Sequence, residues 1–146
     1  MSSFNAIYGR IGKIDNISIL IFLLGTICTP TLLYGIEIFS EDKTEKNKMQ
    51  HTFERAGMKI FSTFDKTVLA SCLFYSGILP LNFQCELKRL LFLKRIFECK
   101  NNALRQILNC FTANDDLFVK YALTKYDSIS TIKNKVFDAF QMLLQL

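Results

Sequence analysis

Hydrophobic and polar residues alternate in blocks along this chain, and the most apolar block covers residues 17–39. No charge lies between Asp15 and Glu37, and at 1.5 Å per residue such a segment could cross a bilayer as one helix. Pro30 cannot donate a helical hydrogen bond, so we expect it to push Thr29 out of the helical region and to divide the segment. The pattern therefore predicts two short helices packed as a core hairpin, with a membrane helix as the alternative.

The clearest amphipathic pattern covers residues 41–61. Met49, Phe53, Ala56 and Ile60 recur there at steps of four, three and four, as residues on one face of a helix do. This spacing predicts a helix that packs one narrow apolar face against the rest of the domain.

Helical patterns continue to the end of the chain. A helix over residues 66–75 is expected to begin after the N-cap Asp65 and to stop at Gly77. Pro80 opens a longer helix whose apolar residues cover most of its circumference, which is typical of a central, buried helix. Three shorter helices are predicted over residues 103–111, 115–123 and 131–146.

No segment shows the alternation typical of strands, so the predicted class is all-α. We expect an irregular bundle of about six to seven helices, as the periodic segments above indicate. Residues 1–14 are interpreted as a connector and residues 15–146 as a single helical domain, with one group of helices in residues 15–76 and another in residues 80–146.

Composition adds two features to this prediction. The chain has 14 Phe and no Trp, and its mean hydropathy is +0.21, which indicates apolar surface that meets a partner. Eighteen Lys and Arg against 13 Asp and Glu give a net charge of +5. This sign is expected of a chain that contacts phosphates, although charge alone names no partner.

The cysteines do not form a metal-binding or catalytic pattern. They are Cys28, Cys72, Cys85, Cys99 and Cys110. There is no CxxC pair, and His51, the only histidine, has no Cys near it in the sequence, so we expect neither a zinc site nor a Cys/His nucleophile. The odd count and the lack of a signal-peptide pattern predict reduced thiols in an intracellular compartment, the nucleus or cytoplasm, and not a secreted protein.

Motifs for common enzyme chemistry are also missing from the sequence. It contains no GxxxxGK[ST], GxGxxG, HExxH or GxSxG. Its adjacent carboxylates, Glu41-Asp42 and Asp115-Asp116, stand at predicted helix starts, where the helix dipole accounts for them. We therefore predict no catalytic residue, no metal and no cofactor.

A line of polar residues runs along the helix predicted over residues 41–61. Lys48, Thr52, Arg55 and Lys59 follow one another at steps of four, three and four, about a quarter turn from the apolar face. Such a row suits nucleic-acid phosphates, because each cation displaces condensed counterions without reading a base. A solvated face without a partner is the alternative.

Two further pairs of cations are weaker candidates for phosphate contacts. Lys88 and Arg95 share one flank of the helix after Pro80, where snorkelling around a buried core is the alternative interpretation. Arg10 and Lys13 come third, within the predicted connector.

Three segments together resemble one family, the reverse transcriptases of non-LTR (LINE-type) retrotransposons. They are "NAIYGRIGK" (residues 5–13), "CTPTLLYGIEIF" (28–39) and "LFYSGILPLNFQCELKRLLFLKRI" (73–96). The likeness covers residues 5–108 and implies a passage from palm to thumb, then thumb helices with Pro30 in a helix break, then a C-terminal part. In this family the thumb holds the template-primer duplex mainly by its backbone.

The chain departs from this family by lacking the catalytic palm. Polymerisation in the family needs paired aspartates that hold two metal ions, and Asp115-Asp116, which follow "TAN", do not match that motif. The resemblance therefore implies a non-catalytic fragment of an RNA-directed DNA polymerase. We expect at most weak, sequence-independent binding of RNA or DNA backbone, with the palm of a full-length reverse transcriptase as a second candidate partner. The alternative is a small helical membrane-associated protein anchored by residues 17–36.

Overall fold

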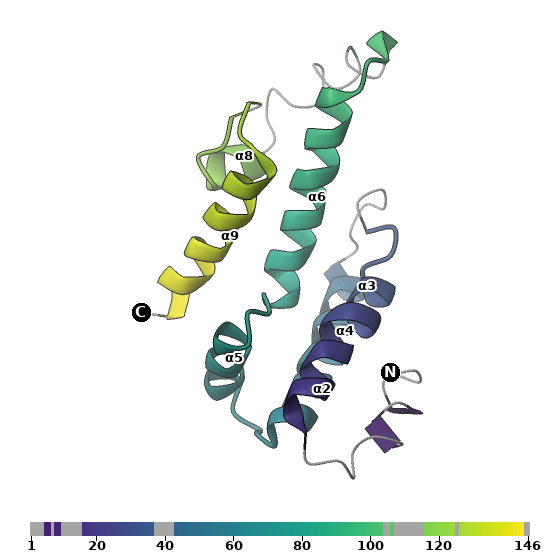
Figure 1. The fold of residues 1–146 in the computed structure, drawn as a ribbon, viewed down its shortest axis with the longest axis vertical. Coiled ribbons are helices and arrows are strands. Elements are labelled where there is room, and N and C mark those ends of the chain that lie inside the picture. Colours follow the sequence, from purple (N-terminus) through teal and green to yellow (C-terminus); the bar gives the residue numbers. More distant parts are fainter. Residues whose placement is uncertain are drawn as a thin grey trace. The chain divides into compact units, whose positions relative to one another are not determined.

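The computed structural model describes residues 5–6, 8–9, 16–36, 43–103, 106, 116–124 and 126–144. Every regular element in these residues is a helix (Figure 1), which confirms the predicted all-α fold of about six to seven helices. The chain divides into two compact units, Met1–Asn82 and Phe83–Leu146.

The apolar segment of the first unit is one continuous helical stretch. It consists in order of α2 (Ile17–Leu23), the π-helix η1 (Leu24–Cys28) and α3 (Thr29–Leu32). The backbone stays helical at both joints, with φ and ψ of −57° and −49° at Leu24 and of −66° and −48° at Thr29. The prediction that Pro30 divides the segment into a helical hairpin is therefore wrong, as is the helix break that the family resemblance implied at this proline.

The wider turn of η1 explains how the helix continues past Pro30. In an α-helix the proline ring would clash with the carbonyl four residues earlier, and the extra residue of a π-turn moves that carbonyl away. The backbone N–H of Thr29 donates to the carbonyl of Leu24, and the Thr29 hydroxyl donates to the same oxygen at 2.7 Å. Thr26 and Thr31 each donate a hydroxyl hydrogen bond to the carbonyl four residues earlier.

The π-turn also keeps the buried side of this stretch aligned. Leu20, Leu24, Thr29 and Leu33 are buried, at steps of four, five and four residues. The step of five spans η1, where one extra residue is accommodated per turn, so all four side chains stay on one side of the stretch. The chain then turns at Gly35, whose φ of 75° is easily reached only by glycine.

The helix α4 (Lys43–Phe61) buries the apolar face that its sequence predicts. Phe53, Ala56 and Ile60 are only 2–4% exposed, and Met49 is half-buried. These three buried residues give α4 a fixed inner side, which determines the residues that face outwards.

The helix α5 (Lys66–Tyr75) begins and ends where its sequence predicts. The Asp65 carboxylate accepts a hydrogen bond from the Thr67 N–H at 2.7 Å, as an N-cap residue does. Gly77 has a φ of 68°, and the N–H of Ile78 returns to the carbonyl of Leu73 at 2.9 Å. This arrangement is a Schellman motif, which satisfies carbonyls at the helix end.

The second unit is built from three helices within the part of the chain that the structure describes. They are α6 (Leu81–Glu98), whose first turn contains the boundary between the units, α8 (Asp116–Lys120) and α9 (Ile129–Leu144). The helix α9 buries Ile132, Val136 and Phe140, and the Phe140 ring lies 5.5 Å from that of Phe83 on α6. The helix predicted over residues 103–111 falls largely outside the described residues.

Candidate nucleic-acid interface

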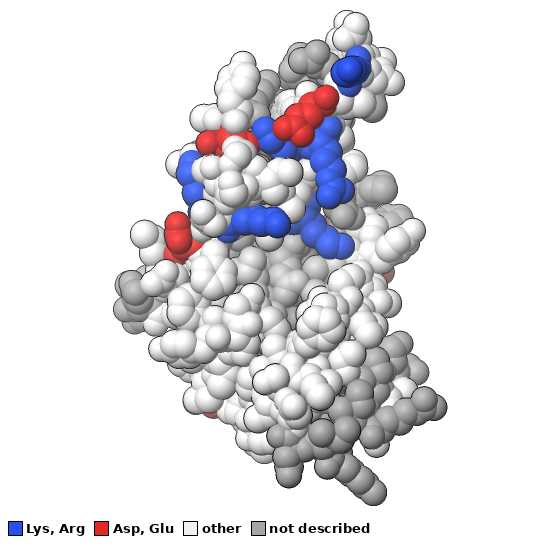
Figure 2. Space-filling model, in the orientation of Figure 1, with Lys and Arg blue, Asp and Glu red and all other residues white. Residues whose placement is uncertain are grey.

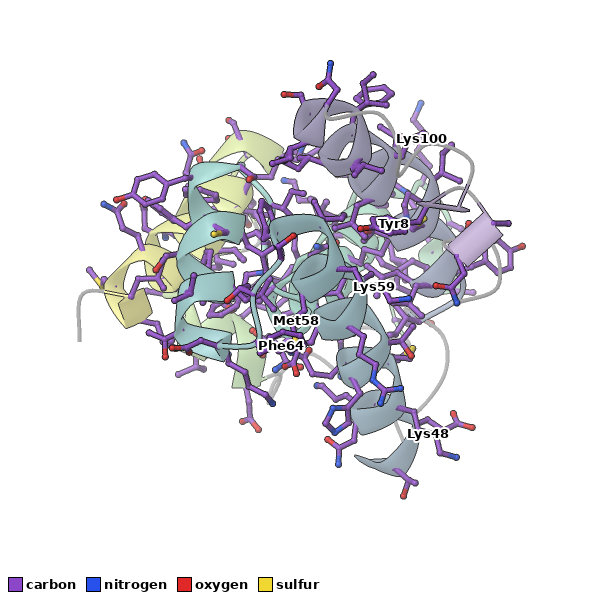
Figure 3. The ribbon with its side chains drawn as sticks, turned by 90° about the horizontal axis from the view of Figure 1, so that it is seen from below. Tyr8, Lys48, Met58, Lys59, Phe64 and Lys100 are labelled. Carbon is purple, nitrogen blue, oxygen red and sulfur yellow. The ribbon has the colours of Figure 1, made fainter. Side chains whose placement is uncertain are left out.

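The outer side of α4 carries three exposed cations. Lys48, Arg55 and Lys59 are exposed, whereas the residues of the apolar face are buried. Figure 3 shows Lys48 and Lys59 extending from different turns of this helix. The two residues are eleven positions apart, which corresponds to about 16 Å of helix axis and matches about five base steps of a nucleic-acid strand.

Two of these cations, Lys48 and Arg55, lack a carboxylate partner among the described residues. Glu54 of the same helix pairs instead with Lys66 of α5 at 3.1 Å. Glu45 is exposed in the first turn of α4, three residues before Lys48.

Lys59 contacts residues near the start of the chain. Its Nζ donates to Oδ1 of Asn5 at 2.9 Å, and the Tyr8 hydroxyl donates to the Lys59 carbonyl at 3.3 Å (Figure 3). An ammonium group has three protons, so two donors of Lys59 remain for a phosphate. The candidates Arg10 and Lys13 lie outside the described residues.

Thr52 does not present a donor to a phosphate. Its hydroxyl donates to the carbonyl of Lys48 at 2.8 Å, and the residue is half-buried. A hydroxyl has one proton, so the bond within the helix leaves Thr52 with acceptor capacity only. Three of the four predicted α4 residues, Lys48, Arg55 and Lys59, are therefore exposed donors on one side of the helix.

The second pair of predicted cations belongs to α6. Arg95 is exposed in the last turn of this helix, and Lys88 is half-buried. Both are residues of the second unit, whereas the α4 line belongs to the first.

A cluster that sequence reasoning missed joins α8 to α6 in the second unit. Lys120 pairs with the Glu86 carboxylate at 2.7 and 2.8 Å, and the hydroxyl of the buried Tyr121 also donates to Glu86. Burial, together with the hydrogen bond and charge of Glu86, raises the pKa of the Tyr121 phenol above its ordinary value of 10.0. The partners are 34 and 35 residues apart, so no local pattern could have indicated them.

A second polar cluster lies before α9. The Asp127 carboxylate accepts from the Thr124 N–H at 2.6 Å and lies 3.9 Å from the Lys135 ammonium. The hydrogen bond from the Thr124 N–H, more than the nearby cations, lowers the pKa of Asp127 below its ordinary value of 3.8. This carboxylate therefore remains ionised and stabilises the turn that leads into α9.

The described cysteines are free thiols and show no sign of activation. They are Cys28, Cys72, Cys85 and Cys99. Burial raises the pKa of the Cys28 thiol, which disfavours the reactive thiolate. Across the described ranges, no group of three or more His, Cys, Asp or Glu residues could hold a metal ion.

Several large apolar side chains of the first unit are exposed. Phe22 is 66% exposed and Tyr75 is 86% exposed, and both line a shallow, open groove together with Gly25 and Ile78. Among the helices described here, none combines the length and the apolar character needed to cross a membrane.

Comparisons with protein-family models, curated proteins and solved structures find no match to this chain.

Proposed function

We propose that this chain binds the backbone of RNA or DNA without sequence preference, and that it is a non-catalytic remnant of a non-LTR reverse transcriptase. The observation that carries the binding proposal is the two-sided character of α4. The helix buries Phe53, Ala56 and Ile60 and holds a line of cations on its outer side. The ancestry is supported by the three sequence segments described above, and not by the helix geometry at Pro30.

Backbone recognition fits this surface better than base recognition does. Lys48 and Lys59 carry flexible ammonium groups, which act as point charges towards phosphates. Base readout in double-stranded DNA requires an element that enters a groove and places side chains against the edges of particular bases. The exposed cations of α4 are donors that any phosphate can accept from, and Thr52 adds no donor because its hydroxyl proton is held by the helix backbone.

The test is the salt dependence of binding to a labelled 20-base RNA–DNA duplex, measured by fluorescence anisotropy. Replacing Lys48, Arg55 and Lys59 together by Ala should flatten the slope of log K against log salt by about 2 to 3, because each lost phosphate contact removes about 0.9. An unchanged slope would contradict the assignment to α4.

Two controls separate charge from shape. The triple variant Lys48→Arg, Arg55→Lys and Lys59→Arg keeps every charge and should keep the slope. Lys66→Ala removes a cation of α5 that pairs with Glu54, away from the α4 line, and should leave the slope nearly unchanged.

Ancestry and membrane anchoring are tested separately. Palm-coding sequence upstream of the codon for Met1, intact or decayed, would support descent from a reverse transcriptase, and its absence would count against it. Anchoring by residues 17–36 instead predicts that the protein stays in the membrane pellet after carbonate extraction.

A further inference from the structure

The positive charge of the chain is unevenly divided between its two units. Residues Met1–Asn82 contain eight Lys and Arg against seven Asp and Glu, whereas Phe83–Leu146 contain ten against six. The second unit therefore carries four of the five net positive charges. Such an excess attracts polyanions over a distance of about one Debye length, roughly 8 to 10 Å.

Internal contacts use a large share of the acidic groups in the second unit. Glu86 is occupied by Lys120 and Tyr121, as described above. The Lys120 ammonium also lies over the rings of Phe83 and Tyr121, at 5.8 and 5.1 Å from their centroids. This carboxylate is thus committed to holding α8 against α6.

Two other carboxylates of this unit are paired in the same way. Glu98 lies 3.1 Å from the ammonium of Lys94, whose side chain is largely buried. Asp127 is held by Thr124 and by Lys135 of α9. The three ion pairs neutralise three cations and three acids within the unit, so the excess of positive charge falls on the remaining side chains.

Three of those remaining cations are exposed and pair with no carboxylate of the described chain. They are Arg95 at the end of α6, Lys100 just beyond it, and Lys133 on α9. Exposed Arg89 and half-buried Lys88 add to the charge of α6. Figure 2 shows Lys and Arg side chains gathered over the surface formed by α6, α8 and α9.

We infer that the second unit forms its own phosphate-binding surface, with Arg95, Lys100 and Lys133 as the contacting cations. The identity of the partner, a nucleic-acid backbone, rests on the function proposed above. The chain then carries phosphate-binding cations on each of its two units.

The experiment uses the full chain and the same labelled RNA–DNA duplex over a series of KCl concentrations. Replacing Arg95, Lys100 and Lys133 together by Gln should flatten the slope of log K against log salt by about 2 to 3. The matched control, Arg95→Lys with Lys100→Arg and Lys133→Arg, keeps the charges and should keep the slope. Circular dichroism checks that both variants retain the helical content of the wild type.

The α4 triple variant, measured in parallel, distinguishes the possible failures. If both triple variants flatten the slope, both proposals hold. If only the variant of the second unit does so, this inference holds and the α4 assignment fails. If only the α4 variant does so, this inference is overturned and the proposed function stands. Binding to vesicles containing 30% phosphatidylserine but not to the duplex would overturn both.

Discussion

A Cβ atom added to Gly57 of α4 would lie 2.8 Å from Cδ1 of Leu69 on α5. Both residues are buried, and so short an approach would force one of the two to move. The helices α4 and α5 therefore come together at a point where α4 has no side chain. Glycine in the interior of a helix is otherwise unfavourable, so this position is explained by packing.

This contact predicts that the effect of Gly57→Ala on the free energy of unfolding changes sign between the wild type and a Leu69→Ala background. Gly57→Ala should destabilise the wild type by about 1 kcal/mol, because overpacking costs about 1 to 3 kcal/mol and helix propensity returns about 1. In a Leu69→Ala background the clash is gone, and Gly57→Ala should stabilise by about 1 kcal/mol. Urea denaturation of the four proteins measures both values. A stabilising Gly57→Ala in the wild type would contradict this prediction and show that the Leu69 side chain moves aside at little cost.

Within the described residues, three helix ends share a residue in the left-handed backbone conformation. Ser62, Gly77 and Ala122 have φ of 51°, 68° and 47°, and after each of them an N–H returns to a carbonyl five residues earlier. Only glycine adopts this conformation without a steric cost. Two of the three helix ends therefore carry a residue that is strained by its backbone.

Glycine substitutions at these ends test that strain. Ala122→Gly should stabilise the protein by about 0.5 to 1 kcal/mol, and Gly77→Ala should destabilise it by about 1, because an L side chain disfavours a positive φ. No atom lies within 4 Å of a Cβ added at Gly77, so the cost there comes from the backbone alone. Gly25→Ala is the control, since it also meets open space but has a helical backbone, and it should be neutral or stabilising. Thermal denaturation would contradict the account if Gly77→Ala and Gly25→Ala had the same effect.

Much of the fold is predictable because its signals are local. The bounds of α5 follow from Asp65 and Gly77, which act within their own turns, and the buried face of α4 follows from one helical period. The outcome at Pro30 was not predictable from the proline alone. It depends on a π-turn and on the Thr29 hydroxyl, which together compensate for the distortion that a proline introduces.

The candidate site also has one part that the sequence predicts and another part that it does not. The line of Lys48, Arg55 and Lys59 lies on a single helix, so its spacing in the sequence fixes its geometry. The pairing of Glu86 with Lys120 joins residues 34 positions apart, and only the packed unit reveals it. The share of cations left without a carboxylate partner therefore could not be obtained from the net charge.

The buried hydroxyl of Thr29 supports the π-turn, and its removal should be measurable. Thr29→Val keeps the shape of the side chain but leaves the Leu24 carbonyl with one donor fewer, so we expect a loss of about 1 kcal/mol in unfolding free energy. Thr31→Val removes the corresponding bond to Ile27 at an exposed site, where water replaces it, and should cost less than about 0.5 kcal/mol. Equal losses in urea denaturation would contradict a special role for the buried bond.

Asp127 predicts an acid-sensitive contribution to stability. Its pKa is lowered in the folded chain, so its stabilising contacts are fully present above the ordinary value of 3.8 and are lost as the pH falls through the folded value. Asp127→Asn should remove this part of the pH dependence, measured as the urea midpoint between pH 6 and pH 2.5. Thr124→Val keeps the backbone N–H, the principal cause of the shift, and should keep most of the dependence. An identical acid transition in wild type and Asp127→Asn would exclude this carboxylate as a cause.

The extra residue in η1 affects how well the helical stretch tolerates a change in length. Deleting one residue between Leu24 and Thr29 would shorten the wide turn to an ordinary one and leave the two flanking halves in phase, but the Pro30 ring would then meet the carbonyl that the π-turn moves away. An insertion elsewhere in the same helical stretch would rotate everything beyond it by about 100° and expose half of the buried side. A deletion in η1 therefore keeps the buried side aligned, and its cost comes from the proline ring and not from a change of register.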